Sequence, residues 1–230
     1  KDARYQTGVA RAIPISASAS GSDEDQNMHY EIVAPAAWDY IAREPQQEAR
    51  LQEAGYFVFG SLAARSVASR STLFSYLQGT HKKVVDINLR APHYTKKLIL
   101  ELATKADILK LNEEELIIIT DWLSDKVSLN ERIEYLQEQF NIPTVIVTRG
   151  AGGAILKQNG TLYTHPGFKV RVMDTVGSGD ALLAAFLTKT IEGNSADKAL
   201  AYGCALGAIV ASQKGGWAHY SLTDLENMIH

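Results

Sequence analysis

The chain has 230 residues, 46% of them hydrophobic, which suits one domain, or one domain with a small appendage. Its formal net charge of −3 argues against a nucleic-acid surface, and no apolar run reaches the ~20 residues that a membrane-spanning helix needs. Cys204 is the only cysteine, so no disulfide can form within the chain. We therefore expect a soluble cytoplasmic protein with no nucleic-acid or membrane partner.

The first 33 residues predict an antiparallel ribbon. Residues 9–15 alternate as a strand does, and residues 28–33 form a second strand. The segment 16–27 between them is small, polar and low in complexity, which predicts a mobile loop. Because a two-stranded ribbon is not stable alone, residues 5–33 are expected to rest on the main body as a lid, or on a second copy as a homodimer clasp.

From residue 34 onward, predicted helices and strands alternate. Short apolar runs predict buried strands at 56–60, 84–88, 107–111 and 144–148. Helices are expected at 45–54, 95–104, 113–120 and 128–140. A further helix follows the strand 56–60 and ends at about residue 77. Two short strands (154–157 and 161–164) and three helices (179–191, 196–213 and 222–229) complete the chain. The alternation predicts an α/β fold with a mainly parallel sheet, which binds ligands beyond the carboxyl ends of its strands.

A glycine-rich turn, DTVGSGD at residues 174–180, leads directly into an apolar helix. Gly177 and Gly179 allow a tight turn and the close approach of a bulky ligand. The first N–H groups of the helix have no partner within it, so the turn predicts a phosphate site. Asp180 would repel a phosphate there unless it accepts a proton from a hydroxyl that attacks the phosphorus. In an isolated Gly-x-Gly-Asp, Asp174 and Asp180 would more simply cap the helix.

The whole heptad, followed by a helix of small apolar residues, resembles the signature of PfkB-type, or ribokinase-like, carbohydrate kinases. The family usually has Ala where this chain has Ser178, a change that keeps the backbone N–H. The stretches FGSLA at 59–63, DINLR at 86–90 and KLNEEE at 110–115 also occur in the family's order. Together with residues 35–39, FGSLA is most similar to bacterial fructokinases of the family. The resemblance implies a three-layer α/β/α fold with a mainly parallel sheet and a small β lid.

The resemblance also implies roles in a phosphoryl transfer that uses ATP and Mg²⁺. Asp180 would be the catalytic base, and the N–H groups of Gly177, Ser178 and Gly179 would hold the transferred group, steadied by Arg90. Six residues would contact the nucleotide: Asn112, Thr148, Gly150, Gly153, Cys204 and Ala208. Glu115 would organise Mg²⁺ through its waters, and a monovalent cation such as K⁺ would bind near Asp174, Val176 and Gly216.

Simpler interpretations stand beside several of these roles. Asp86 and Arg90 could form an ion pair that closes a loop. Asn112 and Glu115 have the spacing of a helix capping box, and we expect them to serve both purposes. Cys204 stands where family members often carry Asn near the adenine, which favours a packing role for the thiol.

The family has a strand, a Gly-Gly-x-x-x-Asn-type segment and several helices before the ribbon, and they supply much of the sugar site. This sequence lacks them, so we expect a piece of a longer kinase. Residues 34–230 would be its kinase domain without the usual N-terminal segment. The expected activity is ATP-dependent phosphorylation of a sugar hydroxyl, with fructose as the first candidate. The alternatives are a kinase for another sugar or a nucleoside, and a non-catalytic relative that binds nucleotides or sugar phosphates.

Overall fold

The structure is a computed structural model that describes residues 4–14, 28–79 and 81–229. Its main sheet has six strands, which lie side by side in the order of the sequence. The strands are β3 (Tyr56–Gly60), β4 (Lys82–Asp86), β5 (Ile108–Asn112), β6 (Thr144–Thr148), β7 (Ala154–Gln158) and β8 (Thr161–His165). The pairings from β3 to β6 are parallel, and β7 and β8 are added antiparallel. The sheet is therefore mainly parallel, as the sequence predicts.

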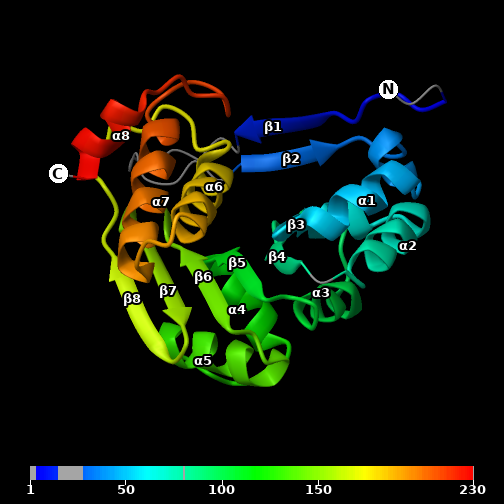
Figure 1. Cartoon of the computed structure of the whole chain (residues 1–230), viewed down its shortest axis with the longest axis horizontal. Helices are drawn as coiled ribbons and strands as arrows, with labels where there is room; N and C mark the ends of the chain where they lie inside the picture. Colours follow the sequence, from blue (N-terminus) through cyan, green and yellow to red (C-terminus); the bar gives the residue numbers. More distant parts are fainter. Residues whose placement is uncertain (1–3, 15–27, 80, 230) are drawn as a thin grey trace.

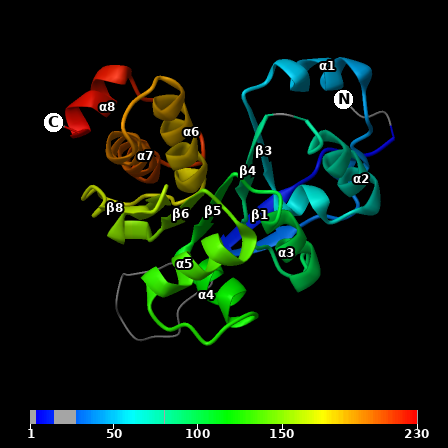
Figure 2. The same cartoon turned by 60° about the horizontal axis from the view of Figure 1, so that its bottom comes forward.

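Helices cover both faces of this sheet, as Figures 1 and 2 show. They are α1 (Pro45–Glu53), α2 (Val67–Tyr76), α3 (Lys96–Ala103), α4 (Glu113–Asp121), α5 (Leu129–Phe140), α6 (Ser178–Ile191), α7 (Ala196–Ala211) and α8 (Leu222–Ile229). The alternation of strand residues divides the core in two. In β6, Val145 and Val147 join a cluster with α4 and α5, whereas Ile146 joins a cluster with α6 and α7. The result is the expected three-layer α/β/α arrangement.

Four of the helices begin at side chains that accept a hydrogen bond from a free N–H group of the first turn. Ser66, Thr95, Asn112 and Ser128 are the N-caps of α2, α3, α4 and α5, and each accepts a hydrogen bond from the N–H three residues later. None of the described helices is long and apolar enough to cross a membrane.

The ribbon forms a second, two-stranded sheet of β1 (Ala10–Pro14) and β2 (Met28–Ile32), which lies at the top of Figure 1. Its strands are antiparallel, with Ala10 opposite Ile32. The predicted mobile loop 16–27 lies outside the described residues. The division into a lid (5–33) and a kinase domain (34–230) stays a prediction.

The largest difference from a predicted strand concerns β4. The run Val84-Val85-Asp86-Ile87-Asn88 predicts a strand over 84–88, but β4 covers Lys82–Asp86. Asn88 has φ +44°, a left-handed conformation that a strand cannot include, so the chain turns away there. The strand begins earlier because Lys82 and Lys83 pair with Tyr56 and Phe57 of β3, although their side chains are polar.

Candidate active site at the carboxyl ends of the strands

The first turn of α6 offers unpaired backbone donors. Gly177 is the N-cap and has φ +82°, which glycine adopts without strain. The Ser178 N–H donates to the Thr175 carbonyl at 3.2 Å, whereas the N–H groups of Gly179 and Asp180 have no acceptor within the described part of the chain. These donors and the helix dipole favour an anion at this position.

The loop before α6 is held in place by the Asp174 carboxylate. Its Oδ1 accepts a hydrogen bond from the Val176 N–H at 2.9 Å, and its Oδ2 accepts one from the Gly215 N–H at 3.0 Å. A Cβ on Gly177 would lie 2.9 Å from the Gly216 carbonyl oxygen. The three residues predicted to bind a monovalent cation, Asp174, Val176 and Gly216, therefore lie together. Their role as cation ligands stays a prediction.

Ser178 connects α6 to α7. Its Oγ donates a hydrogen bond to the Gly207 carbonyl at 3.0 Å. The helices approach closely because α7 has glycine at the contacts: a Cβ on Gly207 would lie 3.2 Å from the Ser178 carbonyl oxygen, and one on Gly203 would lie 2.9 Å from that of Leu182. The serine that differs from the usual family residue thus fixes the orientation of the anion-binding turn.

A buried ion pair lies against this turn. Asp86 and Lys110 are partners in the register of β4 and β5, and Lys110 Nζ lies 2.9 and 2.8 Å from the two Asp86 carboxylate oxygens. Only 6% of the Lys110 side chain and 9% of the Asp86 side chain are exposed. A Cβ on Gly179 would lie 2.8 Å from Lys110 Nζ, so the ammonium contacts the first turn of α6. The strand end and the helix start therefore form one site.

The charges in this site interact. Burial raises the pKa of Asp86 above its ordinary value, the Lys110 ammonium opposes that rise, and the charge of Asp180 adds to it. Asp86 thus pairs with Lys110 rather than with Arg90, the pairing considered from the sequence. No role for Lys110 was predicted from the sequence. The signal that could have indicated one is a charged residue between the apolar residues Leu109 and Leu111 of a buried strand.

The predicted capping box is present. The Glu115 N–H donates to Asn112 Oδ1 at 2.8 Å, and the Asn112 N–H donates to Glu115 Oε2 at 2.9 Å. The other Glu115 oxygen accepts from the Leu89 N–H at 2.7 Å, which ties α4 to the loop that carries Arg90. Burial raises the pKa of Glu115, although these backbone hydrogen bonds oppose the rise. Its role toward Mg²⁺ stays a prediction.

The turn after β6 continues the same edge of the sheet, because Thr148 lies opposite Asn112 in the register. Gly150 has φ +53° and open space where a Cβ would be, so a ligand can approach its backbone. Gly153 differs: a Cβ there would collide with the His165 carbonyl, so packing within the hairpin requires the glycine. The nucleotide contacts of Thr148, Gly150 and Gly153 stay predictions.

The two α7 residues predicted near the nucleotide have different surroundings. Cys204 is 5% exposed and packs in the core cluster that contains Leu182 and Leu183. Burial raises the pKa of its thiol to about 12, and the charge of Arg149 works against that rise. Ala208 is half-buried and follows Gly207. The burial of Cys204 favours the packing role, and both nucleotide contacts stay predictions.

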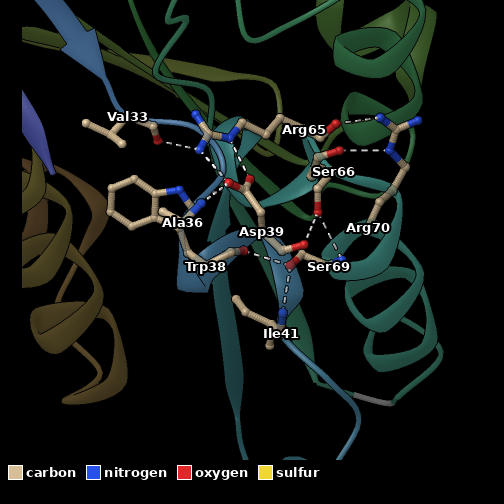
Figure 3. A network of polar contacts seen from close by, with 10 residues as sticks. Val33, Ala36, Trp38, Asp39, Ile41, Arg65, Ser66, Ser69 and Arg70 are labelled. Atoms are coloured by element: carbon tan, nitrogen blue, oxygen red, sulfur yellow. Dashed lines mark hydrogen bonds and ion pairs between the residues drawn. The ribbon is translucent and has the colours of Figure 1, made fainter. Parts of the chain in front are cut away.

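A second polar network, which the sequence analysis missed, lies beside the ribbon (Figure 3). The Arg65 guanidinium donates to both carboxylate oxygens of Asp39, at 2.6 and 2.7 Å, and to the Val33 carbonyl at 2.9 Å. Ser69 Oγ donates to the Trp38 carbonyl at 2.7 Å. These bonds tie the segment after β2 to α2. They border an open groove of about 820 Å³ whose walls also include the 92–95 loop.

Within the described residues, no group of three or more His, Cys, Asp or Glu side chains could hold a metal ion. Mg²⁺ that travels with a nucleotide does not need such a cluster, because it uses phosphate oxygens, water and one or two carboxylates. The unpaired N–H groups of α6 and the open backbone at Gly150 fit a phosphate-bearing ligand.

Solved structures share the fold of this chain. A fructokinase from Xylella fastidiosa with bound ATP matches 99% of this chain and 74% of its own, with a TM-score of 0.81 and 20% identity. A fructokinase from Vibrio cholerae O395, in its fructose, ADP and calcium ion bound form, matches 87% of this chain and 68% of its own, with a TM-score of 0.75 and 23% identity. This likeness shows a ribokinase-like α/β fold.

The family follows from the sequence. The pattern described as pfkB family carbohydrate kinase matches residues 16–221, and the chain belongs to this family. A 2-dehydro-3-deoxygalactonokinase from Haloferax volcanii is 29% identical over 184 residues, which are 76% of this chain and 57% of the relative. Fructokinase-2 from Solanum habrochaites is 32% identical over 142 residues, which are 56% of this chain and 42% of the relative. The chain thus spans about half the length of these curated relatives.

Proposed function

We propose that this chain belongs to an ATP-dependent kinase that phosphorylates a hydroxyl of a sugar, with fructose as the first candidate acceptor. The observation that carries the proposal is the first turn of α6. It combines two unpaired N–H groups with the Asp180 carboxylate at the carboxyl edge of the sheet. A site that only bound phosphate would gain nothing from a carboxylate facing the anion, whereas a transferase needs a base there.

In this proposal each residue has a limited task. Asp180 accepts the proton of the acceptor hydroxyl. The N–H groups of Gly179 and Asp180 stabilise the charge that develops on the transferred phosphoryl group, and Arg90 steadies that group. Mg²⁺ bound with ATP would neutralise phosphate charge, and Glu115 would help to organise it through its waters. Thr148 and Gly150 would contact the nucleotide at the neighbouring strand end.

Two acceptor classes have support. Fructose is favoured by the stretches shared with bacterial fructokinases and by the Solanum relative, which is named a fructokinase. A sugar acid is the second candidate, because the Haloferax relative, which matches 76% of this chain, is named a 2-dehydro-3-deoxygalactonokinase.

The test is ADP release by the purified protein, with its intact mass determined on the same sample. ATP and Mg²⁺ are supplied with fructose, 2-dehydro-3-deoxygalactonate, ribose, adenosine or no acceptor. We expect release that depends on one acceptor, with fructose giving the highest kcat/KM. Release equal to the rate without acceptor in every case would contradict the kinase function and favour a nucleotide-binding protein.

The assignment of the base is tested with Asp180→Asn. Loss of a general base lowers the rate by about 10²–10⁴-fold, and the variant should still bind ATP. Asp197→Asn is the matched control, because Asp197 lies in the first turn of the neighbouring helix α7. If Asp180→Asn kept kcat near that of the control, Asp180 would not be the base.

A further inference from the structure

We propose that the Lys110 ammonium is a further side-chain cation, in addition to Arg90, of the phosphoryl site at the start of α6, and that it contacts the γ-phosphoryl group of ATP. The inference rests on the proposed function for the identity of the ligand. Three features of Lys110 support it: the burial of its side chain, its ion pair with Asp86 and its contact with Gly179.

The Lys110 ammonium is buried against the first turn of α6. Lys110 is the third residue of β5 and is 5% exposed, so its side chain is held within the protein. Nζ lies 2.8 Å from the place that a Cβ of Gly179 would occupy. Glycine at this position therefore lets the ammonium lie against the turn in which the Gly179 and Asp180 N–H groups have no acceptor among the described residues.

Asp86 accepts two hydrogen bonds from the Lys110 ammonium. An ammonium has three N–H donors, and the two carboxylate oxygens of Asp86 account for two of them. Asp86 holds Nζ from the neighbouring strand β4. The third donor is thus available to a ligand oxygen at the α6 turn, as in a charge-assisted hydrogen bond to phosphate.

The charged groups around Lys110 are mainly carboxylates. Carboxylates face the pair from three elements: Asp86 on β4, Glu115 on α4 and Asp180 on α6. The Lys110 charge lowers the pKa of both Asp86 and Glu115, which favours their ionised forms. An anionic phosphoryl group beside these carboxylates needs a cation within the site, and Lys110 is placed to supply it.

Stability alone does not account for the pair. Burying two charges removes them from water, and an apolar pair of similar volume is often as stable. A structural role also predicts no dependence of ligand binding on the ammonium once Asp86 has been neutralised. This difference separates the two explanations experimentally.

The experiment compares Asp86→Asn with the double variant D86N/K110M, because both lack the Asp86 charge and they differ only in the ammonium. Isothermal titration calorimetry measures the Kd of ATP and of ADP, each with Mg²⁺ and without acceptor. Lys157→Met is the control, since Lys157 is a half-buried lysine that pairs with Glu134 on the other side of the sheet. Circular dichroism establishes that each variant is folded.

We expect the double variant to bind ATP about tenfold more weakly than Asp86→Asn does, the factor for one hydrogen bond to a charged group. ADP lacks the γ-phosphoryl group, so its Kd should stay within about twofold across the variants, and Lys157→Met should match the wild type for both nucleotides. Equal ATP affinities for Asp86→Asn and D86N/K110M, or equal losses for ATP and ADP, would overturn the proposal.

Three further outcomes are informative. If Asp86→Asn does not fold, the wild type replaces it, and D86N/K110M must still lose ATP affinity selectively. If the wild type shows this Lys110-dependent preference for ATP but no acceptor-dependent ADP release, the proposed function fails while the Lys110 contact stands. If the wild type does not bind ATP, the Lys110 proposal is overturned as well.

Discussion

The hydroxyl of Ser178 donates a hydrogen bond to the main-chain carbonyl of Gly207, 3.0 Å away, and so joins the first turn of α6 to α7. Gly207 has no Cβ, and one placed there would lie 3.2 Å from the Ser178 carbonyl oxygen, so glycine allows the close approach of the two helices at this contact. This side-chain hydrogen bond helps to hold the anion-binding turn, and with it the N–H groups of the turn, against α7.

Replacement of Ser178 by Ala should lower the free energy of unfolding by about 1 kcal/mol, because the Gly207 carbonyl loses a donor. The backbone N–H groups stay, so kcat should change less than about threefold. Urea unfolding measures the first quantity. Thr188→Ala is the control, since Thr188 bonds only to the Ala184 carbonyl of its own helix among the described contacts. Equal effects of the two substitutions would show that the link between the helices contributes nothing.

Gly177 and Gly193 provide a matched pair of glycines. Both have a left-handed backbone, with φ +82° and +79°, but only Gly177 is crowded, by Gly216. Gly193→Ala should cost about 1 kcal/mol from backbone strain. Gly177→Ala should cost about 1–3 kcal/mol more, because the new Cβ displaces the 215–216 loop, and should weaken ATP binding. Thermal unfolding and calorimetry test this, and equal stability losses would contradict the crowding argument.

Cys204 predicts a dependence of stability on alkaline pH. Burial raises the pKa of the folded thiol from 9.0 to about 12, so the unfolded chain releases this proton first. The contribution of the thiol to stability is fully present below pH 9.0 and is lost as the pH rises toward about 12. The wild type should therefore lose stability relative to Cys204→Ala across this range, by about 1 kcal/mol near pH 10. A constant difference would mean that the thiol ionises equally in both states.

Cys204 also gives a chemical test of its burial. At pH 8 the thiolate is the reactive form, and in the folded chain it is rare as well as inaccessible. Iodoacetamide should label the native protein at least about a hundredfold more slowly than the urea-unfolded protein, as followed by intact mass. Fast labelling of the native protein would place Cys204 at an open surface.

The Asp39–Arg65 pair predicts the opposite dependence, at acid pH. The Arg65 hydrogen bonds hold the pKa of Asp39 below its ordinary value of 3.8. The stabilisation is fully present above pH 3.8 and is lost as the pH falls through the lower folded pKa. Asp39→Asn should therefore be destabilised at neutral pH, and its difference from the wild type should shrink on acidification.

Unfolding measured from pH 6 to pH 2 tests this prediction. Asp121→Asn is the control, because its carboxylate also pairs with an arginine, Arg132, but is 54% exposed. An exposed partner of this kind contributes about 0–1 kcal/mol. A loss for Asp39→Asn no larger than that of Asp121→Asn would show that the buried pair adds no stability.

Local patterns in the sequence determined much of this protein. Runs of apolar residues located the strands of the main sheet, and the glycines and the aspartate of the 174–180 heptad located the start of α6. The Asn112–Glu115 capping box was predictable because both of its hydrogen bonds join residues three apart. These features depend on chemistry within one or two turns of the chain, so a single sequence contains them.

Only the tertiary structure decided which charged groups meet. Asp86 seemed able to pair with Arg90, four residues away, but the parallel register of β4 and β5 places it opposite Lys110. The fold also brings together Arg65 and Asp39, which are 26 residues apart in the sequence, and Ser178 and Gly207, which are 29 residues apart. Such pairs depend on how the crossover helices bring distant strand ends together, and the identity of a residue does not contain that information.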